Sequence, residues 1–351
     1  WFNLTNNMRR QGISTDFDFL NQPSGIDIAG SSISPSAAIR RTLVVGMKNT
    51  LALAVMGIPL LTIIGVVVGI ARLSSNWLVA KAATVYVEVL RNIPPLLIIF
   101  FAFNAVILQL PPIREGYTPF GWFVVSNLFI AVPALNAGAN LAVYLGVLGT
   151  GLVAAGLFWY WRTRVSERTG EPHHRVLWAT GVFLAFAIAG YVILDRPFTI
   201  SLPALEGRRI TGGFSALGSF MAVMVALVLY TASHVAEIVR GSIQAVAKGQ
   251  TEAAEALALR PFQRLRFVVL PQAFRIAVPP MINQYLNYVK NTSLALAVGY
   301  AEITRIVRQT IGNGQPAPQL ILILMGVYLA FSLVISLVAN VVNRRLQLVE
   351  R

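Results

Sequence analysis

The sequence predicts an all-α fold: a polytopic helical membrane protein with about seven transmembrane helices in its 351 residues. Hydrophobic residues make up 56% of the chain and charged residues only 12%, whereas soluble globular domains carry roughly 25% charged residues. Several apolar stretches also reach the length of about 20 residues that a helix needs to cross a bilayer. The chain has no cysteine, which excludes disulfides, thiolate metal sites and cysteine nucleophiles.

Apolar stretches define the expected elements in order along the chain. Residues 1–42 are polar and rich in turn-forming residues, so we expect an exterior N-terminal segment there. Between 111 and 139 the piece FGWFVVSNLFIAVPA is too short to span a membrane, and it is predicted to lie at the interface or to re-enter. Longer stretches predict seven spans, at 43–71, 94–110, 140–161, 176–194, 216–239, 276–298 and 318–342.

These spans divide the chain into a core and an insertion. We assign the first core helices to 43–110 and an inserted region with an extra helical hairpin to 111–215. The rest of the core occupies 216–345, and a short cytoplasmic tail follows at 346–351. An inserted pair of helices preserves the sidedness of everything after it, so the insertion need not disturb the core.

The positions of Lys and Arg predict which ends of the spans face the cytoplasm. Sixteen of the 28 fall in 72–93, 162–175, 240–275 and 343–351, and ten fall in the segments on the other side. Cytoplasmic loops carry the excess of basic residues, so we expect the first set and the C-terminus in the cytoplasm. This pattern accounts for the net charge of +14 without a nucleic-acid-binding surface. Seven spans then place Trp1 outside, and we expect one further helix upstream of it.

The cytoplasmic segment GQTEAAEALALRPFQRLRFVVLPQAFR, residues 249–275, predicts two short helices. Thr251 is the expected N-cap of the first helix, with Glu252 and Glu255 in its first turn, where the helix dipole favours negative charge. Arg260 precedes a proline, which disfavours a continuing helix, so a turn is expected between the two helices.

The second of these helices, FQRLRFVVL, is expected to end before Pro271. We call residues 249–271 the elbow. Its two helices are too short to bury their own apolar faces, which suits docking into a groove on a partner protein. The same pattern suits an amphipathic helix lying on the inner leaflet, held there by its arginines. The residue pattern leaves both interpretations open.

The elbow resembles the cytoplasmic coupling loop of binding-protein-dependent ABC permeases. The family pattern runs Glu-Ala-Ala, three residues, Gly, nine residues, Ile-x-Leu-Pro, and here Ala258 stands where Gly is usual. The resemblance implies that this loop docks in a cleft of an ABC ATPase and transmits its closure to the membrane helices. The coupling residues that it implies are Glu252, Ala253, Ala254, Ala258, Leu259 and Pro271.

Further segments resemble the polar-amino-acid permeases within that family. They are YVEVLRNIPPLL (86–97), VAEIVRGSIQAVAKGQTEAAEAL (235–257) and YVKNTSLALAVGYAEIT (288–304). The large insertion resembles the bigger permease subunits of the general L-amino-acid ABC systems. The resemblance implies a type I ABC importer-like core in the bacterial inner membrane, carrying an amino-acid substrate. It also implies three protein partners: a second related permease subunit, an ABC ATPase dimer and a periplasmic solute-binding protein.

Nothing in the sequence supports catalysis on this chain. A phosphate-binding P-loop needs Gly-Lys followed by Ser or Thr, and no lysine here fits that pattern. We therefore expect ATP and Mg²⁺ on a separate partner chain and no cofactor, metal or catalytic residue on this one. The lysines are Lys48, Lys81, Lys248 and Lys290.

Ionisable and polar residues inside spans are candidates for function, because burying them in a membrane is costly. Glu237 and Arg240 lie at the cytoplasmic end of the 216–239 span, and with Arg91 they are assigned either a structural or a gating role. His234 is more readily explained as a packing residue than as a ligand. A second polar group could line a substrate path or form hydrogen bonds between subunits. Its members are Asn283, Asn287, Lys290, Asn291, Thr292 and Ser293.

The sequence is compatible with three functions. The first is a permease subunit that moves amino acids inward by alternating access, driven by a partner ATPase. The alternative is an ion-coupled secondary transporter, which would need carboxylates or histidines near the middle of the membrane, and the spans offer few. A membrane scaffold or channel is the third. The motif resemblance favours the first.

Overall fold

A computed structural model describes residues 16–170, 174–207 and 209–346, and it divides the chain into two compact units. One unit comprises the residues up to Leu110 together with those from Ala216 onward, and the other comprises Pro111–Ser215. The second unit has the bounds assigned above to the insertion. The expected helix upstream of Trp1, and most of the tail at 346–351, lie outside the described residues.

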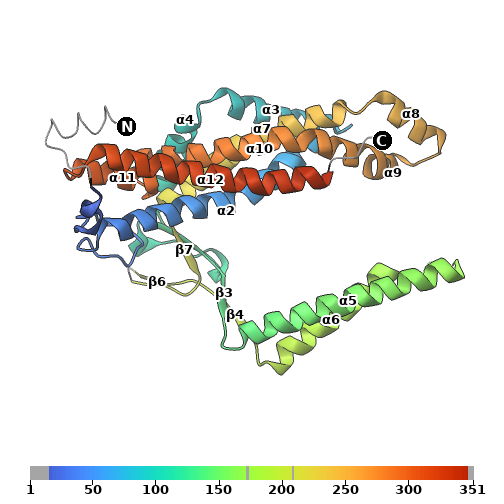
Figure 1. Ribbon diagram of the computed structural model, residues 1–351, viewed down its shortest axis with the longest axis horizontal. Coiled ribbons are helices and arrows are strands. Elements are labelled where there is room, and N and C mark those ends of the chain that lie inside the picture. Colours follow the sequence, from blue (N-terminus) through green and yellow to red (C-terminus); the bar gives the residue numbers. More distant parts are fainter. Residues whose placement is uncertain (1–15, 171–173, 208, 347–351) are drawn as a thin grey trace. The chain divides into compact units, whose positions relative to one another are not determined.

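The first unit is built from helices that run beside one another (Figure 1). Long α-helices form its body, and 3₁₀ and π segments extend or join several of them. Its elements are η1 (Asp18–Asn21), α2 (Ile39–Ala71), α3 (Trp77–Asn92), α4 (Pro95–Phe100), η2 (Phe101–Val106), η3 (Ile107–Gln109), α7 (Gly218–Gln244), α8 (Lys248–Ala256), α9 (Pro261–Arg264), η6 (Leu265–Val269), α10 (Leu270–Asn291), η7 (Thr292–Val298), α11 (Ile303–Gly312) and α12 (Ala317–Leu346).

Six helices of the described chain are long and apolar enough to cross a membrane, or seven if one bent pair counts as a single span. The bent pair is α3 followed by Pro95–Gln109, with an angle of 106° between its limbs. Ile93 at the bend is extended (φ −103°, ψ 130°), because the residue before a proline is disfavoured in the helical region. Every predicted span overlaps one of these helices, so the polytopic helical fold is confirmed. The helix α3 was not predicted.

Helix α2 packs closely on α7 and α10 because glycines on α2 let these two helices approach. A Cβ added at Gly65 would lie 2.5 Å from the Val235 side chain, and one added at Gly57 would lie 1.8 Å from the Tyr288 hydroxyl. Tyr288 is fully buried, and its hydroxyl donates a hydrogen bond to the Leu53 carbonyl at 3.0 Å. Small residues at helix contacts are the usual means of close association in membranes.

The described part of the N-terminal segment, from residue 16 onward, packs against α11 at the end of the unit opposite to α8 and α9 (Figure 1). The described part of this segment, expected to be polar and turn-rich, contributes Phe19, Ile26 and Ile28 to an apolar cluster. From α11 the cluster takes Ile303 and Ile306, both fully buried. These contacts anchor the N-terminal segment to the core.

The second unit contains short strands that were not predicted. The apolar piece at 120–134, expected at the interface or re-entrant, instead forms β1 and β2, which pair antiparallel, and reaches the first residue of β3. Strands of two to four residues leave too few positions for a period of two to emerge from the sequence. Its elements outside the hairpin are η4 (Ile113–Glu115), η5 (Pro119–Gly121), β1 (Val124–Val125), β2 (Phe129–Val132), β3 (Ala134–Ala137), β4 (Phe198–Ser201), β5 (Ala204–Glu206), β6 (Arg209–Thr211) and β7 (Phe214–Leu217).

Two further pairings organise these strands. Strands β5 and β6 form an antiparallel hairpin, and β3 pairs antiparallel with β4 from Ala134 opposite Ser201 to Ala137 opposite Phe198. The β3–β4 pairing brings together the two ends of the segment 138–197. The extra helical hairpin therefore emerges from a closed strand pair.

That hairpin consists of α5 (Leu141–Thr169) and α6 (Arg175–Ile193), which pack on each other. The Tyr144 hydroxyl donates to the Ala187 carbonyl at 3.1 Å. Near the other end, the Arg162 guanidinium lies 5.2 Å from the centroid of the Trp178 ring. Most side chains of both helices are exposed, which is typical of helices whose apolar surface faces lipid.

Candidate functional site

The first helix of the elbow starts earlier than predicted. Helix α8 begins at Lys248 after Ala247 (φ −56°, ψ 131°), so Thr251 lies inside the helix and its prediction as N-cap is wrong. The reason is the short connection: α7 ends at Gln244, and the chain resumes a helix as soon as it has turned. Glu252 and Glu255 therefore lie beyond the first turn, away from the positive end of the helix dipole.

The turn after α8 ends the helix in a left-handed residue. Ala258 has φ +54°, and its N–H donates to the Glu255 carbonyl at 2.8 Å. The N–H of Leu259 donates to the Ala254 carbonyl at 3.1 Å. These two bonds form a Schellman motif, whose left-handed position is usually glycine. The geometry explains why Gly is usual here in the family pattern and shows that Ala keeps the same turn.

The second helix begins at the predicted boundary. Arg260 is extended (ψ 153°) before Pro261, which occupies the first position of α9. The Arg260 N–H donates to the side-chain oxygen of Gln263 at 2.9 Å. This bond satisfies a donor that the start of a helix leaves without a backbone partner.

Side chains close the elbow across its two helices. Glu255 on α8 forms an ion pair with Arg264 on α9. The Gln272 amide donates to the side-chain oxygen of Gln250 at 3.2 Å, which links α10 to α8. The turn, the cap and these two links give the elbow a defined shape.

The prediction that the second helix ends before Pro271 is wrong. The helix runs on from α9 through η6 into α10 and η7, as one span from Pro261 to Val298. Proline has no N–H to donate one turn back, and here the π-helical segment Leu265–Val269 comes directly before it. Pro271 is thus accommodated at the second position of α10, and the elbow is continuous with a membrane helix.

The elbow presents apolar side chains to the outside. Leu257 is 75% exposed and Phe262 68% exposed, one on each side of the turn. Of the predicted coupling residues, Glu252, Ala253 and Ala258 are exposed. Pro271 at the start of α10 is exposed as well, whereas Ala254 is buried and Leu259 is half-buried.

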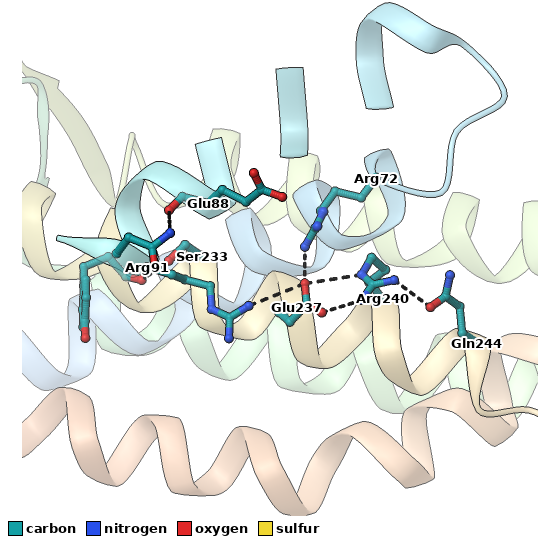
Figure 2. Close-up of polar contacts among 9 residues, drawn as sticks. Arg72, Glu88, Arg91, Ser233, Glu237, Arg240 and Gln244 are labelled. Carbon is teal, nitrogen blue, oxygen red and sulfur yellow. Dashed lines mark hydrogen bonds and ion pairs between the residues drawn. The ribbon is translucent and has the colours of Figure 1, made fainter. Parts of the chain in front are cut away.

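A second group surrounds Glu237 on α7, and Figure 2 shows three arginines directed at its carboxylate. Arg72, the C-cap of α2, forms an ion pair with it. Arg91 from α3 lies 3.7 Å away, and Arg240 approaches to 2.5 Å from one turn along α7. Arg240 also donates to the Gln244 side chain at 2.7 Å. We call Arg72, Arg91, Glu237 and Arg240 the Glu237 cluster.

The cluster joins three helices with an excess of positive charge. Glu237, Arg240 and Arg91 were predicted to have a structural or gating role, but Arg72 was missed. Its place directly after the first span was the available signal. Arg72 is the most enclosed member, with 10% of its side chain exposed, compared with 40% for Arg91. Helix α7 ends seven residues after Glu237, at Gln244, so the cluster lies close to the elbow along the chain.

His234 lies one turn before Glu237 and packs against Tyr230. Their ring centroids are 4.8 Å apart in an edge-to-face arrangement (72°). This contact supports the interpretation of His234 as a packing residue.

The predicted polar group of α10 and η7 separates into two parts. The hydroxyl of Thr292 donates to the Val289 carbonyl at 2.6 Å, and that of Ser293 donates to the Lys290 carbonyl at 2.8 Å. Thr292 is fully buried, and Asn291 beside it is half-buried.

Asn283, Asn287 and Lys290 form the other part. They are spaced by four and three residues, so they share one face of α10. All three are exposed on the isolated chain.

Glu302 was missed as a candidate, although it is fully buried. It lies between two spans and caps α11, where its carboxylate accepts from the N–H groups of Thr304 and Arg305, each at 2.8 Å. The Tyr328 hydroxyl also donates to it, at 3.2 Å. Burial raises the pKa of Glu302 to about 7, and the hydrogen bonds oppose that rise only in part. The available signal was an acid just before a short amphipathic helix.

Comparison with known proteins places the chain among transport permeases. The family described as "Binding-protein-dependent transport system inner membrane component" matches residues 61–348. The chain is 40% identical to the general L-amino acid transport system permease protein AapQ of Rhizobium johnstonii, over 99% of this chain and 88% of that protein. It is 38% identical to the glutamate/glutamine/aspartate/asparagine transport system permease protein BztB of Rhodobacter capsulatus, over 98% of this chain and 88% of that protein.

A solved structure has the same fold. The crystal structure of an amino acid ABC transporter with histidines matches with a TM-score of 0.52 at 18% identity, over 87% of this chain and 94% of that one. The family match, which runs from residue 61 to residue 348, includes both limbs of the bent span, the elbow and the Glu237 cluster. The chain therefore belongs to the family of inner membrane components of binding-protein-dependent transport systems.

Proposed function

We propose that this chain is the transmembrane subunit of an ATP-binding-cassette importer, which moves amino acids delivered by a periplasmic binding protein into the cytoplasm by alternating access. The elbow is the observation that carries the proposal. It is closed by its own turn, cap and ion pair, it exposes apolar side chains, and it is continuous with α10. The relatives named as amino-acid permeases support the substrate class. Membership of a binding-protein-dependent family favours this function over an ion-coupled secondary transporter.

ATP and Mg²⁺ bind on a separate ATPase dimer in this proposal. The elbow fits a groove on that partner, because Leu257 and Phe262 are exposed on either side of a turn held in one shape. A rigid elbow transmits a push from the ATPase without deforming, and its second helix delivers that push directly to α10. The elbow and the C-terminus then lie on the cytoplasmic side, in agreement with the distribution of basic residues.

The Glu237 cluster is suited to spread this movement to neighbouring helices. Glu237 lies about 10 Å from the end of α7 along the helix axis, from the rise per residue. Its arginine partners belong to α2 and α3 as well as to α7. A displacement of α8 therefore changes the geometry of ion pairs that hold three helices together. This arrangement supports a gating role for Glu237, Arg240 and Arg91.

The exposed polar face of α10 supports pairing with a second permease subunit. Asn283, Asn287 and Lys290 lie within a membrane span and are exposed on the isolated chain. Polar groups that face lipid have no hydrogen-bond partners, so such a face is expected to line water or another protein. A related permease covering this face would form a polar path between the two subunits, with groups that bind the carboxylate and ammonium of an amino acid.

Substituting Glu252 with Lys tests the docking role of the elbow. Glu252 is exposed on α8, so reversing its charge is expected to leave the fold of the membrane unit intact. We expect the purified variant to lose the ATPase, or to lose substrate-stimulated ATP hydrolysis, while its elution profile in detergent stays unchanged. Glu167→Lys, the same change on the exposed end of α5, is the matched control. Normal uptake by the Glu252 variant would contradict the docking role.

A further inference from the structure

The first turns of α2 border a cavity of about 400 Å³ with an unusual combination of side chains. Three are basic, three are aliphatic, and all belong to the first unit. These first turns lie at the end of α2 opposite to the elbow (Figure 1). The lining residues of the cavity are Ile33, Arg40, Arg41, Val44, Val45 and Lys48.

The three cations of this cavity have no carboxylate within ion-pair distance among the described residues. No ion pair joins Arg40, Arg41 or Lys48 to any carboxylate in the described chain. Residues 1–15 contain two further arginines and no Asp or Glu, so they bring no acidic side chain. Arg40 and Arg41 also occupy the first turn of α2, where the helix dipole disfavours positive charge. An anion bound here would reduce the repulsion among the three cations and their repulsion from the positive end of the helix dipole.

The basic residues continue into an apolar face that is exposed within the membrane span. Arg40, Val44 and Lys48 are spaced by four residues, lie on one face of α2 and are all exposed. Lys48 therefore lies about 12 Å further along the helix axis than Arg40, and its long side chain can reach back toward the membrane surface. Leu51 and Val55 extend the exposed face, with 47% and 63% of each residue accessible.

We propose that this cavity binds an anionic phospholipid, with the headgroup phosphate held by Arg40, Arg41 and Lys48 and an acyl chain lying along Val44, Leu51 and Val55. Arginine suits a phosphate because its planar guanidinium donates two parallel hydrogen bonds. The site lies at the predicted exterior end of the span, where the positive-inside rule disfavours paired arginines. Lipid binding gives those arginines a function at that end, and it goes beyond the transport role proposed above.

Native mass spectrometry of the purified importer complex tests the proposal. The complex is titrated with phosphatidylglycerol and, separately, with phosphatidylcholine of the same acyl chains. We expect selective binding of phosphatidylglycerol, and an affinity about 100-fold lower for the triple variant Arg40→Gln, Arg41→Gln, Lys48→Gln, because each basic residue near the membrane surface strengthens anionic-lipid binding about fivefold. The triple variant Arg164→Gln, Arg168→Gln, Arg175→Gln removes the same charge from the α5–α6 hairpin. It is expected to lose much less affinity, because these arginines do not line the cavity, and an equal loss would overturn the site.

Further arms of the experiment separate the other ligands that basic residues attract. Soluble glycerol phosphate is expected not to displace the lipid, because it lacks the acyl chain that contacts Val44 and Leu51; displacement at similar concentrations would overturn the two-part site. Lys48→Arg is expected to retain binding, because it keeps the charge. An unchanged elution profile of the triple variant in detergent would show that its loss of binding is not caused by misfolding. Unchanged phosphatidylglycerol binding by the triple variant would overturn the proposal. So would unchanged lipid binding together with weaker association of the periplasmic binding protein, which would assign the cavity to that protein.

Discussion

At the scale of single residues, Ala258 holds the elbow in a conformation that alanine adopts only at a cost. Its φ of +54° lies in the left-handed region, where a Cβ crowds the following carbonyl and costs roughly 1–2 kcal/mol. The two Schellman hydrogen bonds of the turn offset that cost. The folded elbow is therefore less stable with alanine at this position than it would be with glycine.

Replacing Ala258 with Gly is expected to stabilise the elbow. The substitution removes the Cβ strain, and after allowance for the greater chain entropy of glycine we expect a gain of about 1 kcal/mol. Amide hydrogen exchange at Leu259 and in α8 should then slow about fivefold. Ala253→Gly, the same change in the interior of α8, is the matched control and is expected to destabilise the helix by about 1 kcal/mol. Faster exchange in the Ala258 variant would contradict this account.

Single residues also mark the limits of what the sequence could predict. Motif spacing located Glu252 and Ala258 on the elbow, because a coupling pattern is a property of consecutive residues. Thr251 was misplaced as a cap, because its propensity could not reveal that α7 and α8 are joined by so short a turn. Arg72 was missed because its partner Glu237 lies far away along the chain. Glu302 was missed because its burial depends on packing against α12, which its own segment does not reveal.

At the scale of secondary-structure elements, the Glu237 cluster ties together α2, α3 and α7. One carboxylate serves three guanidinium groups, so each arginine depends on Glu237 for its compensating charge. Removing the carboxylate would leave the arginines to repel one another in a partly buried site. The cluster is thus expected to matter more to the packing of these helices than a pair on the surface would.

Glu237→Gln is expected to lower the stability of the purified subunit by roughly 2 kcal/mol. That is below the ~3–5 kcal/mol of a fully buried pair, because 26% of the Glu237 side chain is exposed. Adding Arg72→Gln should recover part of the loss, since it removes the most enclosed of the unpaired cations. Thermal unfolding in detergent measures both effects, with Glu115→Gln at the exposed end of η4 as the control. Additive losses in the double variant would contradict the coupling.

The elements themselves were unequally predictable. Spans follow from composition and length, so all seven stretches were located. Helix α3 is amphipathic and forms the first limb of the bent span, and its charged residues were interpreted as a loop. The second helix of the elbow was cut short at Pro271, because a proline within a helix normally breaks it, and the π-helical segment that accommodates it leaves no mark in the sequence.

At the scale of the whole molecule, the α5–α6 hairpin is separable from the core by topology. Strand β3 leads into the hairpin and strand β4 follows it, and their residues Ala137 and Phe198 lie opposite each other. Both helices are apolar enough to cross the membrane, so the hairpin adds two crossings. An even number of crossings leaves the orientation of α7 and the elbow unchanged. We therefore expect the core to keep its orientation in the membrane without the hairpin.

Replacing residues 138–197 with Asn-Gly tests this topology. A two-residue turn of that type joins directly opposed antiparallel strands, so β3 and β4 should still pair. We expect the shortened chain to insert with its C-terminus on the same side as in the wild type, as measured with a C-terminal reporter that is active in only one compartment. Deleting α6 alone is the control, because an odd change in the number of crossings is expected to invert the C-terminus or to prevent insertion. If the full deletion moved the C-terminus to the other side, α5 and α6 would not both cross the membrane, and the predicted cytoplasmic position of the elbow would be wrong.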